Sequence, residues 1–391
     1  MTFKQYKFLG IAIFGYVASM SAAFAVFPVM GDPVIVKYVG SIDWPQETPV
    51  TVPFLTQGDA NAINDLHGDV KCDINISTPG NYHMALRDAM YGRPDLGHTG
   101  LVEQIKTLNG ATICWTTSPP INEEQIPVEN VQFKNINLKG LPALAMAPGG
   151  KMNNLVNKGF VDPLSRKPFL RNRGNVMLVR ADRTDRVKDV CSLANPSVRL
   201  VTPNPPGSTA SEGGSFGNFS RTVFNIMDQN DDLACNENAT EIFESIFGQD
   251  ISKINTEDLN NTFNHKKIAK VYKSSGVRWV ASSRIMHRDQ PYALCNDYAD
   301  VGVIFYHQAV YLKETMAPLG CDLEIVPFHP QGIAPETTLS GMPVGTLHIA
   351  KVAGSFDQKT LDGRDLIYNF LTTSPVWTQI MADHGMDDPT P

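Results

Sequence analysis

The sequence lacks the short patterns that mark common catalytic and metal-binding sites. Its six cysteines include no C-x-x-C pair, and no His or Cys spacing typical of a zinc site occurs. The run GSFG at Gly214–Gly217 lies in a polar segment rather than on the strand-to-helix turn that serine hydrolases need, and no Lys-Ser or Lys-Thr follows it. We therefore expect a protein that is not an enzyme and that uses no cofactor and no metal.

Basic residues are in the minority. The chain has 33 Lys and Arg against 40 Asp and Glu, which gives a net charge of −7. This balance argues against a nucleic acid partner and against an anionic membrane surface. It leaves a small anionic ligand open, because local hydrogen-bond donors decide whether such a ligand binds.

Long hydrophobic runs are also absent after residue 25, so we expect a soluble mature protein. Residues 1–25 have the features of a signal peptide: Lys4 and Lys7, an apolar run at Phe8–Ala18, and the small-x-small site that ends at Ala25. A membrane anchor is the alternative, but this run is shorter than the ~20 residues that span a bilayer. We expect cleavage near Ala25 and export to the periplasm.

The stretch Asn175–Thr209 organises the rest of the chain. Val176–Val179 is an apolar run of the length expected for a buried strand, and Val198–Val201 is a second one that leads into a Pro/Gly bend ending in Ser208 and Thr209. Loops at the carboxyl ends of strands are where open α/β sheets bind ligands. Main-chain N–H groups of a following helix can then face an anion.

The same alternation of strand, polar loop and helix occurs on both sides of this stretch, and it predicts α/β architecture with parallel sheets. Two segments do not fit: an irregular N-terminal extension at 26–71, with a short strand at 34–39, and a polar, partly helical insertion at 210–275. The predicted strands are 73–76, 112–115, 141–147, 277–281, 301–305, 321–328 and 347–352. The predicted helices are 82–91, 151–158, 291–298, 308–316, 363–371 and 374–381, with a polar turn at 285–290.

Hydroxyl side chains cluster in three of the predicted strand-end loops. A dehydrated tetrahedral oxyanion needs several such donors and no carboxylate nearby. A single Ser/Thr loop more often caps a helix, but three loops favour binding. The donors are Ser77 and Thr78, then Thr116, Thr117 and Ser118, then Ser208 and Thr209, and Asn81, Tyr82 and His83 follow the first loop and are expected to close it.

The pair His287-Arg288 follows another predicted strand. Arg288 is suited to bind an oxyanion or carboxylate through two hydrogen bonds, although an exposed ion pair with Asp289 explains it equally well. Three loop histidines, His83, His287 and His307, also suggest a zinc or copper site. Their spacing gives that reading no support.

Four runs in the same order resemble the periplasmic molybdate-binding-type solute receptors, which belong to the type II periplasmic binding proteins. They are GDVKCDINIS, the run from Leu141 to Arg183 that contains APGGKMNNLVNKGFVDPLSRKPFLRNRGNVMLVR, the run VKDVCSLANPSVRLVTPNPPGS, and ADVGVIFYHQAV. The resemblance covers about two-thirds of the mature chain by order of motifs. The extension, the insertion and the loop TTSPP depart from the family pattern.

The resemblance implies two α/β lobes joined by two crossover strands, near Val176–Arg180 and Glu324–Phe328. Lobe one would hold 26–176 and 327–391, and lobe two 177–326. Sorting the cysteines by lobe then pairs Cys72 with Cys114, Cys191 with Cys235, and Cys295 with Cys321. The family also places a ligand-contacting Tyr where Tyr306 stands.

The resemblance further implies a monomeric receptor that captures a small anion and delivers it to an inner-membrane permease of the ABC type. Molybdate, tungstate, sulfate-like anions and small carboxylates all stay open as ligands. The alternative is an accessory protein of the same fold that binds a protein partner through the extension and the insertion. A metal-binding receptor and a hydrolase are weaker alternatives.

Overall fold

The structure is a computed structural model, and it describes residues 35–36, 65–68, 72–79, 82–118, 130–133, 136–139, 141–202, 213–230, 233, 235–247, 279–282, 286–295, 297–329 and 341–389. The predicted signal peptide at 1–25 lies outside these residues. None of the helices in the described ranges has the length and hydropathy that crossing a bilayer requires.

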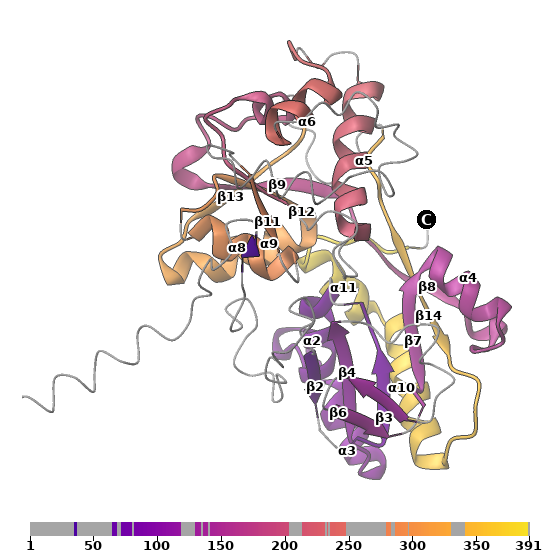
Figure 1. The fold of residues 1–391 in the computed structure, drawn as a ribbon. Coiled ribbons are helices and arrows are strands. Elements are labelled where there is room, and N and C mark those ends of the chain that lie inside the picture. The colour runs from indigo at the N-terminus through magenta and orange to yellow at the C-terminus, as the bar shows by residue number, and fades with distance from the viewer. Residues whose placement is uncertain are drawn as a thin grey trace, which may run out of the picture.

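The described strands form two large sheets, which lie one above the other as two lobes (Figure 1). The first sheet has the order β2-β4-β3-β7-β14-β8 and the second β1-β11-β10-β12-β9-β13, and β5 and β6 form a separate pair. The bounds in the first sheet are β2 (Asp65–Gly68), β3 (Ile74–Ser77), β4 (Ile113–Ser118), β7 (Leu144–Pro148), β8 (Lys167–Arg171) and β14 (Thr346–Lys351). In the second they are β1 (Ile35–Val36), β9 (Asn175–Arg180), β10 (Leu200–Thr202), β11 (Trp279–Ser282), β12 (Val301–Phe305) and β13 (Leu323–Val326), and the pair is β5 (Asn130–Phe133) and β6 (Ile136–Lys139).

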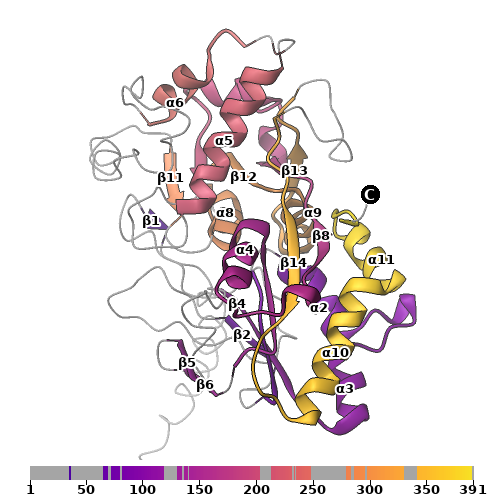
Figure 2. The same ribbon diagram turned by 90° about the vertical axis from the view of Figure 1, so that its right-hand side faces the viewer.

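Helices cover both faces of each sheet, as Figures 1 and 2 show. This mixed α/β, two-lobed architecture is the predicted fold class. In the first lobe α2 (His83–Tyr91), α3 (Leu101–Asn109), α10 (Gln358–Thr373) and α11 (Pro375–Asp383) pack on one face and α4 (Gly149–Asn157) on the other. In the second lobe α5 (Gly213–Gln229) and α6 (Ala239–Phe247) pack on one face and α8 (Met286–Cys295) and α9 (Tyr306–Met316) on the other.

The apolar run of β9 is continuous because this strand is buried on both faces. Met177 and Val179 point into the core beneath α5 and α6, whereas Val176 and Leu178 point into the core beneath α8 and α9. Successive side chains of a strand point to opposite faces, so a central strand needs apolar residues at every position.

The chain passes between the sheets twice after β8. The first passage, from Arg171 to Asn175, is very short, and the second joins β13 to β14. The N-terminal region contributes β1 to the edge of the second sheet and β2 to the edge of the first. The lobe limits predicted from the sequence stay predictions.

Three disulfides connect the cysteine pairs that sorting by lobe implied. Cys72 bonds Cys114 beside β3 and β4, Cys191 bonds Cys235 near α6, and Cys295 bonds Cys321 between the end of α8 and β13. Each bond joins segments of the same lobe, so none of them restrains the motion of one lobe against the other.

One local prediction was wrong. The segment 285–290 is not a polar turn, because α8 starts at Met286 and includes Pro291 in its interior. The partly helical character predicted for 210–275 is confirmed in the described residues, where α5 and α6 supply Phe219 and Phe243 to the core of the second lobe. Residues 248–275 of the predicted insertion lie outside the described ranges.

Candidate functional site

Two helices from different lobes begin side by side. α2 follows the carboxyl end of β3 after a loop, and α9 follows β12 directly. Tyr82, the N-cap residue of α2, stacks on His307, the second residue of α9, with ring centroids 4.8 Å apart and planes at 14°. The first turns of the two helices therefore meet at the contact between the lobes.

Neither N-cap residue, Tyr82 for α2 or Phe305 for α9, caps its helix with its own side chain. The N-cap residue of α2 is Tyr82, so the alternative role of Ser77 and Thr78 as N-cap residues of this helix is not what the structure has. The first main-chain N–H groups of a helix carry its positive dipole end. Two such ends at one place favour a negatively charged group between the lobes.

The rings at this contact are buried. His307 is fully buried and also stacks on Phe305, at 5.5 Å and 17°. Burial raises the pKa of the Tyr82 phenol to about 12, although the hydrogen bond from Asn172 lowers it. Tyr82 is therefore a neutral phenol at physiological pH.

Asn172 ties together the two passages between the lobes. Its Nδ2 donates to the Tyr82 hydroxyl at 3.0 Å, and its Oδ1 accepts from the main-chain N–H of Gly174 at 3.0 Å and of Gly345 at 3.1 Å. Gly174 belongs to the first passage and Gly345 to the end of the second. One buried amide thus connects both passages to the residue that starts α2.

Helix α5 holds the same passages from the second lobe. Asn175 donates to the Thr222 hydroxyl at 2.8 Å, and Asn225 donates to the carbonyl of Gly341 at 3.2 Å. Asn175 and Thr222 are both buried. A rotation of the lobes would have to bend the chain between Asn172 and Asn175.

Tyr306 lies where the end of the first lobe's α11 meets α9. The guanidinium of Arg173 lies 5.8 Å from the centre of its ring. A Cβ at Gly385 would come within 2.7 Å of the same ring, so glycine is what allows this close approach. Tyr306 therefore contacts both the passage between the lobes and the C-terminal helix.

The structure places some of the predicted ligand residues and leaves others undescribed. Ser77, Thr78 and His83 are buried at the end of β3 and the start of α2, beside Tyr82. Thr116, Thr117 and Ser118 end β4, where Thr116 pairs with Ser77 in register, and His287 and Arg288 lie in the first turn of α8, but the side chains of these five residues are outside the described part. Asn81, Ser208 and Thr209 lie outside it altogether, so these predicted contacts stay predictions.

The described residues give no support to the two alternative readings, a metal site and a hydrolase site. Within the described ranges, no group of three His, Cys, Asp or Glu side chains is arranged to hold a metal ion. Ser215 of the GSFG run is the third residue of α5, which begins at Gly213, whereas β10 ends at Thr202. It is not on a tight turn between strand and helix, which a hydrolase nucleophile requires.

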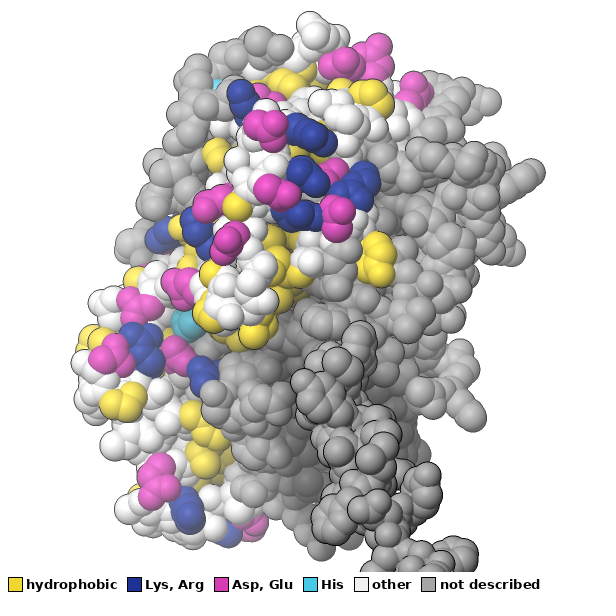
Figure 3. All heavy atoms as spheres, turned by 90° about the vertical axis from the view of Figure 1, so that its left-hand side faces the viewer, with side chains coloured by type: hydrophobic (Ala, Val, Ile, Leu, Met, Phe, Trp, Pro, Cys, Tyr) yellow, Lys and Arg dark blue, Asp and Glu magenta, His cyan; other side chains and the backbone are white. Residues whose placement is uncertain are grey.

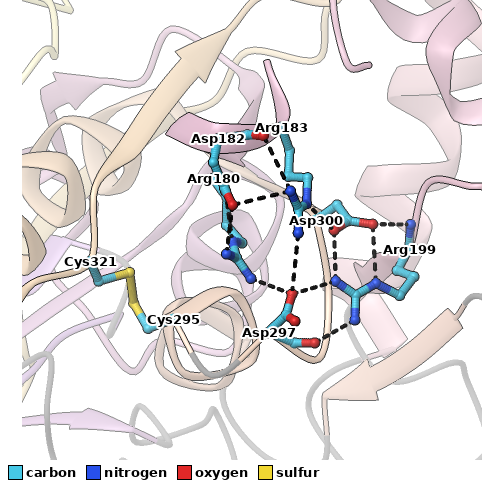
Figure 4. A network of polar contacts seen from close by, with 8 residues as sticks. All are labelled: Arg180, Asp182, Arg183, Arg199, Cys295, Asp297, Asp300 and Cys321. Carbon is cyan, nitrogen blue, oxygen red and sulfur yellow. Dashed lines mark hydrogen bonds and ion pairs between the residues drawn. A yellow bond between two sulfur atoms is a disulfide. The ribbon is translucent and has the colours of Figure 1, made fainter. Parts of the chain in front are cut away.

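A network of ion pairs lies at the opposite end of the second sheet and has a structural role. Figure 4 shows three arginines and three aspartates, which include the buried Asp300 between Arg183 and Arg199. Burial raises the pKa of Asp300, but the hydrogen bonds and charge of Arg199 outweigh it, so the net shift is downward. Figure 3 shows the side of the molecule that faces left in Figure 1, and there too the basic and acidic side chains are interspersed rather than gathered by sign. The network's members are Arg180, Arg183, Arg199, Asp182, Asp297 and Asp300.

Sequence reasoning missed three polar residues near the lobe contact. Asn172 appeared only as part of a family motif, and Asn175 only as the first residue of the stretch Asn175–Thr209. Gln308 carried no signal, because it looks like an ordinary helical residue. All three are buried, and buried amides next to a predicted loop are recognisable only once the chain is folded.

No protein-family model and no curated protein matches the sequence. Among solved structures, Peb3 from Campylobacter jejuni matches 81% of this chain and 100% of its own at 13% identity, with a TM-score of 0.43. The periplasmic molybdate-binding protein of Azotobacter vinelandii matches the same shares at 12% identity and a TM-score of 0.44. The sulfate-binding protein SubI of Mycobacterium tuberculosis matches 82% of this chain and 88% of its own at 12% identity, also with a TM-score of 0.44. These values assign neither a family nor a ligand to the chain.

Proposed function

We propose that this protein is an exported solute-binding protein that captures a small anion between its two lobes and passes it to an ABC-type permease. The observation that carries the proposal is the meeting of α2 and α9, where Tyr82 of one lobe stacks on His307 of the other. A ligand held there would touch both lobes at once. Binding would then be coupled to closure of the lobes.

The polarity of this place suits an anion. The first turns of α2 and α9 offer main-chain donors, and the buried Ser77, Thr78 and His83 add side-chain groups. The buried carboxylate in the described second lobe, Asp300, is engaged with arginines at the other end of the sheet. An anion between the lobes would therefore meet donors rather than this negative charge.

Export is part of the proposal. Three disulfides, all within a lobe, suit an oxidising compartment. The N-terminal residues supply the expected signal peptide, whose removal can be read directly as the mass of the secreted protein.

A thermal-shift screen of oxyanions and small carboxylates, followed by calorimetric titration of the hits, tests the function. A ligand of the folded state should raise the melting temperature by mass action, by an amount that grows with ligand concentration. Tyr82→Phe should weaken binding, because it frees Asn172 and alters the ring at the lobe contact. The matched control is Tyr368→Phe, which removes a buried hydroxyl bonded to the carbonyl of Ser165 at 2.5 Å, away from the contact.

The proposal fails if no anion or carboxylate shifts the melting temperature of the wild type. Co-purification of a protein partner in that case would favour the accessory role. Equal effects of Tyr82→Phe and Tyr368→Phe on the affinity would place the ligand elsewhere.

A further inference from the structure

The first turn of α9 contains an unpaired buried amide. Gln308, the third residue of the helix, is only 2% exposed, and both its Nε2 and its Oε1 lack a hydrogen-bond partner in the described structure. The neighbouring helix provides a partial contrast: the Nε2 of Gln290, also buried, donates to the carbonyl of Val303 at 2.7 Å, although its Oε1 lacks a partner in the described structure. Through its Nε2, Gln290 is tied to the main chain of β12, whereas neither end of the Gln308 amide has such a bond.

A buried amide without partners destabilises the fold, so its retention calls for a partner that is present when the protein functions. Helical side chains lean toward the N-terminus of their helix. The amide of Gln308 therefore leans toward the first turn of α9, which begins at the carboxyl end of β12 beside the Tyr82–His307 stack. This is the place where the proposed ligand would lie.

The chemistry of an amide limits what that partner can be. The Nε2 group donates and the Oε1 atom accepts, so one ligand satisfies both only if it carries an acceptor and a donor side by side. A fully deprotonated tetrahedral oxyanion offers acceptors alone, and it would place its negative charge against Oε1. A carboxylate with a neighbouring hydroxyl offers both.

An amino group would be the other possible donor, but an ammonium needs a carboxylate partner when it is buried. Near this contact the buried polar side chains of the described chain carry amides, hydroxyls and imidazoles but no carboxylate: Ser77, Thr78, His83, Asn172, His307 and Gln308. We propose that the ligand is a small hydroxycarboxylate and that Gln308 reads its hydroxyl group. This inference rests on the proposed function, since it assumes that an anion binds between the lobes.

Calorimetric titration with matched ligand pairs tests the inference on the full-length mature protein. The pairs are glycolate with acetate and lactate with propionate, and sulfate and molybdate serve as fully deprotonated oxyanions. The wild type should bind each hydroxylated member at least about tenfold more tightly than its partner, because the partner leaves Oε1 unpaired. Gln308→Met keeps the length of the side chain without the amide, and it should reduce that ratio to about one.

Gln290→Met is the control, since this buried amide bonds the main chain of β12. It should lower the melting temperature and leave the hydroxyl ratio unchanged. The wild-type comparison is informative even if a variant does not fold. Three results would each overturn the inference while leaving anion binding in place. They are equal affinities within each ligand pair, tighter binding of sulfate or molybdate than of the hydroxycarboxylates, and a hydroxylated-to-unhydroxylated affinity ratio that Gln308→Met does not change. A wild type that binds none of these ligands would refute the proposed function, and the inference with it.

Discussion

Replacing Asn172 by Ala is the sharpest test of how the two lobes are joined. The substitution removes three hydrogen bonds from a buried position: one to the Tyr82 hydroxyl and two from the main-chain N–H groups of Gly174 and Gly345. Each such bond contributes about 0.5–1.5 kcal/mol net, and the substitution also leaves the two main-chain N–H groups without their acceptor. We expect a loss of about 3 kcal/mol in the free energy of unfolding.

Urea unfolding, analysed by linear extrapolation, measures this loss. Asn195→Ala is a matched control, because Asn195 is exposed and its side chain accepts only from nearby Ser197, so its effect should stay below about 1 kcal/mol. The double variant with Tyr82→Phe should show a coupling of about 1 kcal/mol, since the two substitutions break the same bond. A loss no larger than that of the control, or additive effects of Asn172→Ala and Tyr82→Phe, would refute the account of the joint.

Four further predictions concern stability. Asp300→Asn should destabilise by about 2 kcal/mol because Arg183 and Arg199 lose their buried partner, against less than about 0.5 kcal/mol for the exposed Asp182→Asn. The lowered pKa of Asp300 makes its contribution present above the ordinary value of 3.8 and lost as the pH falls through the folded-state value, so acid unfolding should depend less on pH in Asp300→Asn. The raised pKa of Tyr82 has the opposite sign: unfolding free energy should fall by up to about 3 kcal/mol as the pH rises from about 10 to about 12, and Tyr82→Phe should flatten this fall in pH-dependent urea curves. Gly385→Ala should destabilise by more than Gly110→Ala in thermal unfolding, because both glycines have a φ near +70° but only Gly385 faces a ring, that of Tyr306; equal losses would contradict the packing.

Much of the fold could be predicted from local patterns. The apolar runs of β9 and β12 mark strands because these strands are buried on both faces, and the hydroxyl-rich ends of β3 and β4 mark the loops that follow them. Pro291 was misleading, since proline usually stands at the start of a helix, and here α8 continues through it. In α5 the many polar residues concealed the spacing of Phe219, Val223 and Ile226, which is that of a buried helical face.

The joint between the lobes could not be predicted in the same way. Asn172 is separated by 90 residues from Tyr82 and by 173 from Gly345, and its bonds join segments that come together only in the folded chain. Gln308 could not be singled out from the sequence either, because what marks it is the absence of hydrogen-bond partners for its buried amide in the described structure. Each cysteine pair closes within one lobe, and assigning segments to lobes fixes Cys72 with Cys114 but leaves three pairings open for the four cysteines of the second lobe.

The position of β14 has a consequence for synthesis of the chain. This strand is the last to be made, yet it lies inside the first sheet, between β7 and β8. Until Thr346–Lys351 have left the ribosome, the first sheet lacks the strand that joins β7 to β8. Strands β9 to β13 of the second sheet are by then already available to pair. A nascent chain stopped before Thr346 should therefore expose the facing edges of β7 and β8, which protease digestion of stalled chains would reveal.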